Sequence, residues 1–276
     1  MNCNFNTSES WVILSPIEQQ IKAKIEAVGT PLKDWDINIY RGILTGYNDA
    51  FIITGERKNE LIAQDPKSAD IIRPILRGRD IKRYGYEFAN LWLINSHNGI
   101  KEKGINPIDI NEYPAIKTHL DQYWDKISIR SDKGDTAYNL RNCAYLEDFY
   151  KQKIVFQEMV SEPSFILDFE GKYMCLDTAR IITGENLKLL LAVLNSKIFF
   201  FSVKYFYGGG SLGELGVRMK HTFFEKFPIP TLCIGDVEKI HDYISTPNIK
   251  NIEKIDKILY RSFLLEENEI EFIESQ

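Results

Sequence analysis

The chain has 276 residues, of which 44% are hydrophobic and 12% aromatic, so it is long enough to bury a full core, which excludes a disordered segment. The N-terminal sequence MNCNFNTSESWVIL lacks a basic region followed by an apolar core, so we predict no secretory signal. The longest apolar region, 187–206, is interrupted by polar residues, so we predict no membrane span. We therefore expect a soluble, cytoplasmic protein with no membrane partner, and its formal net charge of −5 gives no general attraction to nucleic acid.

The first predicted element is a helix that begins after Ser15. Ser15 can cap the helix, Pro16 suits its first position, and Glu18 completes a capping box. Apolar residues from Ile17 to Val28 recur at helical spacing, and Gly29 suits the left-handed conformation that ends a helix. The sequence therefore predicts a helix from Pro16 to Gly29.

A polar turn between two β-type runs follows, in the sequence IYRGILTGYNDAFII at 39–53. We predict a hairpin-like structure over 37–53 that presents polar side chains from a rigid edge. Arginine and asparagine match guanine and adenine edges, threonine and tyrosine can contact phosphates, and Gly42 and Gly46 would let the backbone approach a ligand. The alternative is a tight turn whose residues are polar because turns are solvated. The polar residues of this turn are Arg41, Thr45, Tyr47, Asn48 and Asp49.

Basic residues cluster next, in RPILRGRDIKR at 73–83. The tail from residue 236 holds five Lys and Arg against ten Asp and Glu, so the rest of the chain is neutral, with 29 of each sign. Against that neutral background the cluster carries a local charge of +4, which can neutralise several phosphates. The alternative is a solvated turn or helix end. The charged residues of the cluster are Arg73, Arg77, Arg79, Asp80, Lys82 and Arg83.

The centre of the chain is predicted to be rich in β-structure. A strand at 91–95 and a helix at 113–127 come first, and the helix carries apolar and aromatic residues at helical spacing. Four short β-type runs separated by turn residues follow, which we interpret as a meander. They lie at 153–158, 164–169, 172–176 and 180–183.

Helical character returns towards the C-terminus. An apolar helix at 187–195 continues into an aromatic stretch at 198–207, and the glycine-rich GGGSLGELG at 208–216 follows. We interpret that glycine-rich segment as a mobile loop that closes over a ligand, with Lys204, Tyr207 and Arg218 placed to contact phosphates or stack on bases. Residues 236–276 predict two or three amphipathic helices.

Known catalytic motifs are absent from the sequence. We find no GxxxxGK(S/T), HExxH, GxSxG or CxxC pattern. An amino-methyltransferase needs an Asp/Asn-Pro-Pro-aromatic turn, and the nearest match, at 106–108, lacks the second proline and the aromatic residue. The four histidines, at 97, 119, 221 and 241, show no metal-ligand spacing. We therefore predict no catalytic residue, metal site or cofactor in this chain.

One alternative is a metal-dependent nuclease that uses Glu158, Asp168, Glu170 and Lys172. Two carboxylates on Mg²⁺ and a lysine can activate water for phosphodiester cleavage. Gly171, however, suits a hairpin turn, which would expose these acids at its tip instead of bringing them together.

Several segments, taken together and in order, resemble a known family. They are RGILTGYNDAFII at 41–53, IIRPILRGRDIKRY at 71–84, YPAIKTHL at 113–120, KIVFQEM at 153–159, LLLAVLNSKIFFF at 189–201 and KFPIP at 226–230. The set resembles the TaqI-like C-terminal specificity domain, the target-recognition region of type II restriction-modification enzymes and related adenine-N6 DNA methyltransferases. Trp11 to Ser15 is similar to the linker by which these domains leave the methyltransferase core.

The resemblance implies that this polypeptide reads a DNA sequence for a catalytic domain, in cis or in trans, that lies outside the chain. That domain would use S-adenosylmethionine, and Mg²⁺ where restriction accompanies methylation. For Arg79 and Asp80 the alternative is a salt bridge that shapes their turn. The expected contacts to double-stranded DNA, transferred by matching segment, come from the polar turn, the basic cluster and the glycine-rich loop with its flanks. They are Arg41, Thr45, Tyr47, Asn48, Arg77, Arg79, Lys82, Arg83, Lys204, Tyr207, Gly209 and Arg218.

We therefore expect an α/β mixed (α+β) fold. A β-rich target-recognition domain with surrounding helices would span residues 1–235, and a helical C-terminal segment would span 236–276. Side chains in the major groove would supply specificity, and the clustered arginines and lysines would fix the register. Besides the nuclease, a protein-docking module whose apolar C-terminal helices bind a partner stays open.

Overall fold

The computed structural model describes residues 14–207 and 216–276, and its fold is mixed α/β, as predicted. The chain forms two compact units. We call Met1–Asp36, Met159–Pro163 and Lys188–Gln276 the helical unit, and Ile37–Glu158 and Ser164–Leu187 the β-rich unit. The boundary predicted at residue 235 rests on sequence character and stays a prediction.

The helical unit begins with a helix whose start matches its sequence signals. In α1 (Pro16–Glu26) the Ser15 side chain accepts from the Glu18 N–H, and the Glu18 carboxylate accepts from the Ser15 N–H, which is the predicted capping box. The helix ends at Glu26, before the predicted Gly29. Gly29 has φ +85°, and a Cβ there would lie 2.1 Å from the Ile229 carbonyl oxygen, so this position requires glycine.

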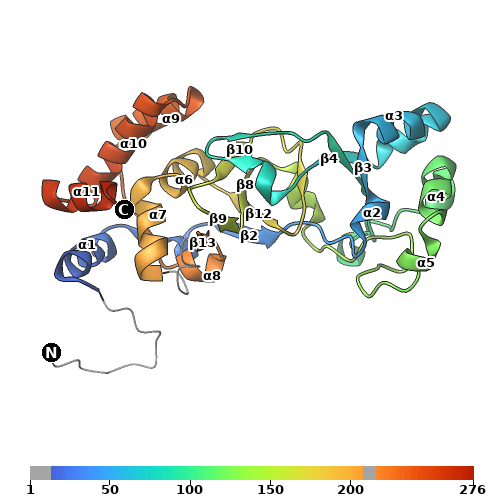
Figure 1. Cartoon of the computed structure of the whole chain (residues 1–276), viewed down its shortest axis with the longest axis horizontal. Helices are drawn as coiled ribbons and strands as arrows, with labels where there is room; N and C mark the ends of the chain where they lie inside the picture. Colours follow the sequence, from blue (N-terminus) through green and yellow to red (C-terminus); the bar gives the residue numbers. More distant parts are fainter. Residues whose placement is uncertain (1–13, 208–215) are drawn as a thin grey trace, which may run out of the picture. The chain divides into compact units, whose positions relative to one another are not determined.

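The remaining elements of the helical unit surround short strand pairs. The predicted two or three C-terminal helices are three, α9, α10 and α11. Figure 1 shows α11 near α1 and α9 beside α10, and Lys24 of α1 binds Glu269 of α11 at 2.7 Å. Strand β1 pairs with β14, and β9 pairs with β13. The elements are β1 (Thr30–Pro31), η1 (Leu32–Asp34), β9 (Met159–Val160), α6 (Leu187–Leu194), α7 (Lys197–Ser202), η7 (Val203–Tyr207), β13 (Val217–Arg218), α8 (His221–Phe224), β14 (Pro228–Ile229), α9 (Ile234–Ser245), α10 (Ile249–Ser262) and α11 (Glu267–Glu274).

The described residues contain no single helix that is long and apolar enough to cross a bilayer. Leu187–Leu194 and Lys197–Tyr207 meet the length and composition only as a pair, and the two are bent by 62°.

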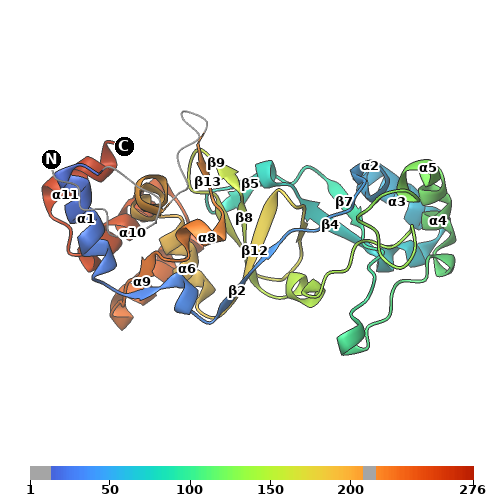
Figure 2. The same ribbon diagram turned by 90° about the horizontal axis from the view of Figure 1, so that it is seen from below.

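A four-stranded antiparallel sheet forms the first half of the β-rich unit. Its order is β10-β8-β12-β2, so β8 (Lys153–Gln157) and β12 (Ala179–Gly184) are central while β10 (Phe165–Asp168) and β2 (Ile37–Arg41) are edges. Figure 2 labels β8, β12 and β2 of this sheet. The predicted meander is therefore wrong in its connections. A meander would pair consecutive runs, but β11 (Met174–Cys175) leaves this sheet and pairs in parallel with β4.

A second four-stranded sheet, of order β11-β4-β7-β3, completes the unit. The predicted hairpin over 37–53 is wrong, because β2 pairs with β12 whereas β3 (Ile52–Thr54) pairs with β7 (Leu91–Ile94) in this other sheet. The predicted helix over 113–127 is also two helices. Besides these, the unit contains α2 (Asn48–Phe51), α3 (Gly55–Gln64), η2 (Pro66–Asp70), β4 (Ile72–Leu76), η3 (Gly78–Asp80), β5 (Ile81–Lys82), β6 (Gly85–Tyr86), η4 (Lys101–Lys103), η5 (Ile110–Glu112), α4 (Pro114–Asp121), α5 (Trp124–Ile127) and η6 (Leu146–Tyr150).

One hydrophobic core joins the two sheets of the β-rich unit. Val155, Ile166 and Ile181 share one face of the first sheet and are buried together with Leu93 and Ile75 of the second. Successive side chains point to opposite faces of the sheet, so Val155 and Ile181 face this core, while Ile154 and Ile182 are buried on the other face. Eight of the twelve predicted DNA contacts lie in this unit, in the segments 41–48 and 77–83.

Candidate nucleic-acid interface

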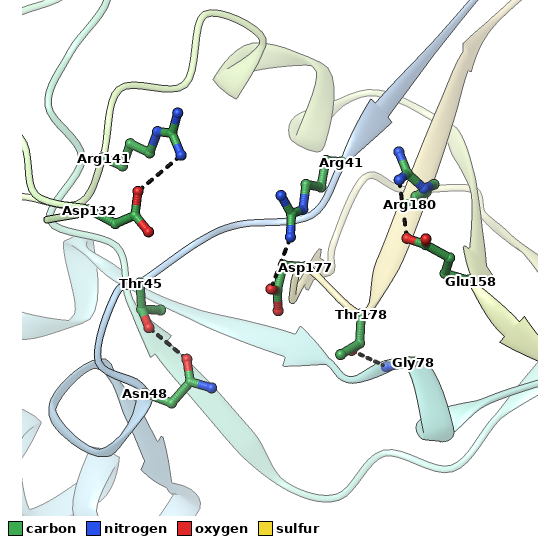
Figure 3. Close-up of polar contacts among 10 residues, drawn as sticks. All are labelled: Arg41, Thr45, Asn48, Gly78, Asp132, Arg141, Glu158, Asp177, Thr178 and Arg180. Carbon is green, nitrogen blue, oxygen red and sulfur yellow. Dashed lines mark hydrogen bonds and ion pairs between the residues drawn. The ribbon is translucent and has the colours of Figure 1, made fainter. Parts of the chain in front are cut away.

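Arg41 lies at the end of β2, an edge strand. Its Nη2 donates to the Asp177 carboxylate at 3.3 Å, and about half of its side chain stays exposed (Figure 3). Arg180 stands opposite Arg41 on β12, and it is largely buried in an ion pair with Glu158 at 3.1 Å. Of these two neighbouring arginines, only Arg41 offers hydrogen-bond donors to a large external partner.

The turn after Arg41 is packed against the protein itself, which corrects two predictions. A Cβ at Gly42 would lie 2.0 Å from the Leu176 carbonyl oxygen, and one at Gly46, with φ +70°, 2.9 Å from that of Asp132. These glycines therefore allow close approach of neighbouring backbone, not of a ligand. Thr45 is also not presented outward, because it is 2% exposed.

Thr45 stabilises the turn. Its hydroxyl donates to the Asn48 amide oxygen at 2.6 Å and accepts from the Tyr47 N–H at 3.2 Å, an arrangement that fixes the entry into α2. Asn48 is exposed, with its amide nitrogen directed away from Thr45 (Figure 3). Tyr47 is half-buried against Tyr123, and burial and the neighbouring Asp49 raise the pKa of its phenol. From this turn, Asn48 is the residue best placed for an external contact.

The basic cluster divides into braced and exposed residues. Arg77 forms a bidentate ion pair with Asp80, from Nη2 to Oδ1 at 2.7 Å and from Nε to Oδ2 at 3.0 Å, and Asp80 also accepts the Arg77 N–H. Asp80 is 4% exposed and raises the pKa of Arg77. The salt bridge that shapes this turn is therefore formed by Arg77 and Asp80, whereas the alternative drawn from the sequence paired Arg79 with Asp80.

The other cations of the cluster differ in what they contact. Arg73 donates to the carbonyl oxygens of Ala69 and Asp70, which end η2, and to that of Ile72, so it caps the end of η2. Arg79 is exposed and has no ion pair among the described residues. Lys82 is exposed and lies 3.8 Å from the Glu87 carboxylate, while half-buried Arg83 lies over the ring of Tyr84. Arg79 is thus the cluster's most accessible cation.

A turn at 176–179 links the two polar segments within the β-rich unit. Asp177 binds Arg41, and the neighbouring Thr178 hydroxyl accepts the Gly78 N–H at 3.1 Å (Figure 3). Gly78 begins the η3 turn that carries Arg79 and is itself buried, with space for no side chain because a Cβ would lie 2.8 Å from the Thr178 carbonyl. The structure therefore brings the Arg41 and Arg79 segments together, although 37 residues separate them in the chain.

The remaining predicted contacts belong to the helical unit. Half-buried Lys204 lies over the Tyr205 ring, and Arg218 is exposed on β13. The Tyr207 hydroxyl donates to Glu26 at 3.2 Å, and burial raises the pKa of that phenol. Gly209 lies outside the described residues, as do most of the glycine-rich loop and Trp11.

The β-rich unit contains a pocket that no sequence pattern predicted, and we call it the Arg41/Arg141 pocket. Its volume is about 330 Å³. Arg141, about half exposed, donates to Asp132 at 2.9 Å, so each of the two arginines holds one carboxylate (Figure 3). Three separate segments form the walls: 41–44, Asn95 with His97, and 140–146.

Arg130, which the sequence did not single out, fixes the loop that carries Arg141. Its guanidinium is 7% exposed and donates to the carbonyl oxygens of Thr45, Asp132, Ala137 and Asn139, and it lies 4.5 Å from the centre of the Phe51 ring. Burial lowers the pKa of Arg130 to about 10, so it remains charged at neutral pH. A buried cation with no carboxylate partner among the described residues thus ties the Thr45 turn to the 130–139 loop.

Comparison with family models matches the TaqI-like C-terminal specificity domain over residues 73–229. The chain belongs to this family. The region matched to the TaqI-like specificity domain includes the basic cluster, two of the three pocket walls and Arg218, whereas the 41–48 segment precedes it. The resemblance first noted in the scattered sequence segments is therefore confirmed.

Two solved structures share the fold of this TaqI-like specificity domain. The type IIL restriction-modification enzyme MmeI, in complex with DNA, matches with a TM-score of 0.63 and 13% identity, over 89% of this chain and 36% of that one. The type IIG restriction endonuclease BpuSI matches with a TM-score of 0.58 and 16% identity, over 94% of this chain and 31% of that one. The chain spans about a third of the length of either enzyme. Comparison with curated proteins gives no match.

The acids proposed for a nuclease do not converge in this specificity domain. Asp168 is buried and binds the Lys153 ammonium at 2.6 Å, while its other oxygen accepts the Lys172 N–H at 3.0 Å. Glu158 pairs with Arg180, and Glu170 is exposed. Among the described residues, no three acids, histidines or cysteines are grouped to hold a metal ion. The hairpin expected at Gly171 is also wrong, since β10 and β11 lie in different sheets.

Proposed function

We propose that this specificity domain recognises a DNA sequence on behalf of an adenine-N6 DNA methyltransferase of a restriction-modification system. The observation that carries the proposal is the family match over 73–229, the region that contains the exposed Arg79 and the Arg141 loop. The DNA complex of the similar enzyme MmeI supports double-stranded DNA as the partner. A module with this partner would act in the cytoplasm.

The exposed cations of the β-rich unit suit contact with a duplex. Arg41 and Arg141 are each held by a carboxylate on one side, which orients the remaining guanidinium donors. Arg79, with no such partner among the described residues, is suited to a phosphate, a contact that requires charge more than fixed geometry. We assign base recognition to Asn48 and backbone contact to Arg79 and Lys82, and we assign to the held arginines a contact of fixed geometry with an acceptor-rich group of the DNA.

Catalysis belongs to a different stretch of polypeptide in this proposal. The chain has no Asp/Asn-Pro-Pro-aromatic turn, so the methyltransferase part, in cis or in trans, would bind S-adenosylmethionine and receive the flipped adenine. Methyl transfer to a duplex is therefore expected from the chain combined with such a part, and not from the chain alone. Transfer by the isolated chain would contradict this division of roles.

The test of duplex binding is a salt titration with the Arg79→Ala variant. Each phosphate contact contributes about 0.9 to the slope of log affinity against log salt, so the variant should bind more weakly and lose about one unit of slope. Arg261→Ala is the matched control, because Arg261 is exposed but pairs with Asp236 in the helical unit. A protein-docking module would show neither duplex affinity nor a salt slope. An unchanged slope in Arg79→Ala would remove the backbone assignment.

A further inference from the structure

The Arg41/Arg141 pocket presents mainly hydrogen-bond donors. Arg41 and Arg141 each use one Nη atom on a carboxylate, and their other nitrogens have no partner among the described residues. Asn142 accepts from the Asn98 amide through Oδ1, which leaves its amide nitrogen available. Two permanent cations and an amide N–H₂ therefore face one cavity, which favours an anion rich in acceptor atoms.

His97 adds a further donor in a fixed form. Its Nδ1 accepts the Gly99 N–H at 3.1 Å, so the proton of the neutral ring lies on Nε2. Burial, and the nearby charge of Arg73, lower the pKa of His97, which keeps the ring neutral near pH 7. The pocket thus holds a neutral imidazole donor as well as two guanidinium groups.

Asn95 supplies a buried, unsatisfied acceptor in the wall. Its Nδ2 donates to the Tyr150 hydroxyl at 3.1 Å, while Oδ1 is buried and has no hydrogen-bond partner among the described residues. An unsatisfied buried oxygen is destabilising, and a donor on a ligand would relieve that cost. The surrounding wall is apolar and rigid, with buried Ile43 and Leu140 and with Tyr145 stacked on Tyr40 at 4.3 Å.

We infer that the Arg41/Arg141 pocket binds a single nucleotide, with its phosphate at the two arginines and an amino-bearing base against the apolar wall and Asn95. The volume of about 330 Å³ is at the lower end for ligand pockets and excludes a double helix, so one nucleotide is the unit of DNA that fits. The nucleotide can come from a DNA strand, as an unpaired residue, or from solution. The strand-borne source rests on the proposed function.

The first experiment follows the His97 imidazole by NMR while nucleotides are added. The sequence has four histidines, and His97→Gln assigns the signal. Deoxycytidine monophosphate should shift it at millimolar concentration. Deoxyuridine monophosphate, which has an oxygen in place of the amino group, should bind several-fold more weakly. If inorganic phosphate bound as tightly as deoxycytidine monophosphate, the nucleotide assignment would be overturned. Equal binding of the two nucleotides would overturn the role of Asn95. No shift with either nucleotide would overturn the pocket as a binding site.

Variants separate a bound ligand from a general charge effect. Arg141→Gln should weaken deoxycytidine monophosphate binding about tenfold, because one charge-assisted hydrogen bond to phosphate is lost. Arg261→Gln is the matched control and should leave binding unchanged. Ala144 is an exposed residue of the wall, so Ala144→Phe should block the cavity while Ala144→Ser preserves it. Normal binding in Ala144→Phe would contradict the assignment.

The two sources are distinguished with duplexes. If the nucleotide is part of a DNA strand, a duplex that carries one unpaired cytidine should shift the His97 signal, and deoxycytidine monophosphate should compete with that duplex. A response to the free nucleotide alone would assign the pocket to a soluble nucleotide. Salt-dependent binding of a paired duplex with a silent His97 under all conditions would refute the pocket and leave the proposed function intact. Nucleotide binding without affinity for any duplex would refute the proposed function and leave the pocket.

Discussion

The basic cluster at 73–83 and the Arg41/Arg141 pocket use arginine in opposite ways. In the cluster, Arg73 donates three hydrogen bonds to backbone carbonyl oxygens, two of them at the end of η2, and Arg77 is locked to a carboxylate that is 4% exposed. At the pocket, Arg41 and Arg141 are 49% and 55% exposed and hold one partner each. The density of charge along the chain therefore does not measure the charge that the surface offers to DNA.

The largest expected effect is on stability, and it comes from the cluster. Asp80→Ala should lower the free energy of unfolding by about 3 kcal/mol, because it leaves the Arg77 guanidinium and its backbone N–H without their buried partner. Urea denaturation measures the loss. Asp132→Ala is the matched control at the pocket, where the ion pair is exposed and should contribute less than about 1 kcal/mol. Equal losses of stability in the two variants would contradict the difference between a buried ion pair in the cluster and an exposed one at the pocket.

The next largest expected effect is a loss of stability in acid, which comes from a buried histidine and not from the exposed arginines. His119 is 4% exposed, donates from Nε2 to the Ala50 carbonyl at 3.0 Å and accepts the Arg57 Nε–H at Nδ1. Burial lowers the pKa of His119 below its ordinary value near 6.5. The unfolded chain therefore binds a proton first, so stability is full above about pH 6.5 and falls as pH is lowered, by at most ~1.4 kcal/mol per pH unit for this group.

Denaturation at pH 7 and pH 5 checks that sign. His119→Gln keeps an amide donor for Ala50 but removes the titration, so its stability should be lower at pH 7 and should depend less on pH. The arginines at the pocket stay charged across this range. A pH dependence that is the same in His119→Gln and in the unchanged chain would assign the acid sensitivity elsewhere.

Local signals allowed the helices to be predicted. The cap at Ser15, the proline and the acid of the first turn lie within four residues of one another, so they act before any tertiary contact forms. The apolar stripe of α10 likewise follows from its own spacing, with Ile255, Ile258 and Leu259 buried. The C-terminal helices were therefore predictable, as was the mixed fold class.

Strand pairing and the pocket depend on contacts between distant residues, which spacing does not encode. Arg41 of the edge strand β2 pairs with Arg180 of β12, 139 residues later, and binds Asp177 across 136 residues. A hairpin was the natural expectation at 37–53 because consecutive strands commonly pair, but burial in two different sheets overrode it. Arg130 gave no signal at all, since its partners are backbone carbonyls, which every residue possesses.

The smallest expected effect is that of Asp177→Ala, which removes the carboxylate bound to Arg41 at the pocket. Because the Arg41–Asp177 pair is partly exposed, the variant should lose less than about 1 kcal/mol of stability. Removal of one negative charge beside Arg41 should raise affinity for random duplex by about twofold, while discrimination between sequences falls because the guanidinium is no longer held. Competition binding with specific and random duplexes measures both.

Glu112→Ala is the matched control, since Glu112 forms an exposed ion pair with Lys67 in the same unit and should change neither quantity beyond its small stability cost. If Asp177→Ala lowered affinity for all duplexes alike, the carboxylate would serve to keep Arg41 in place for phosphate contact. If discrimination fell while affinity for random duplex rose, Arg41 would make a sequence-dependent contact whose geometry depends on Asp177. The second result is the one that an arginine with one fixed and one open edge requires.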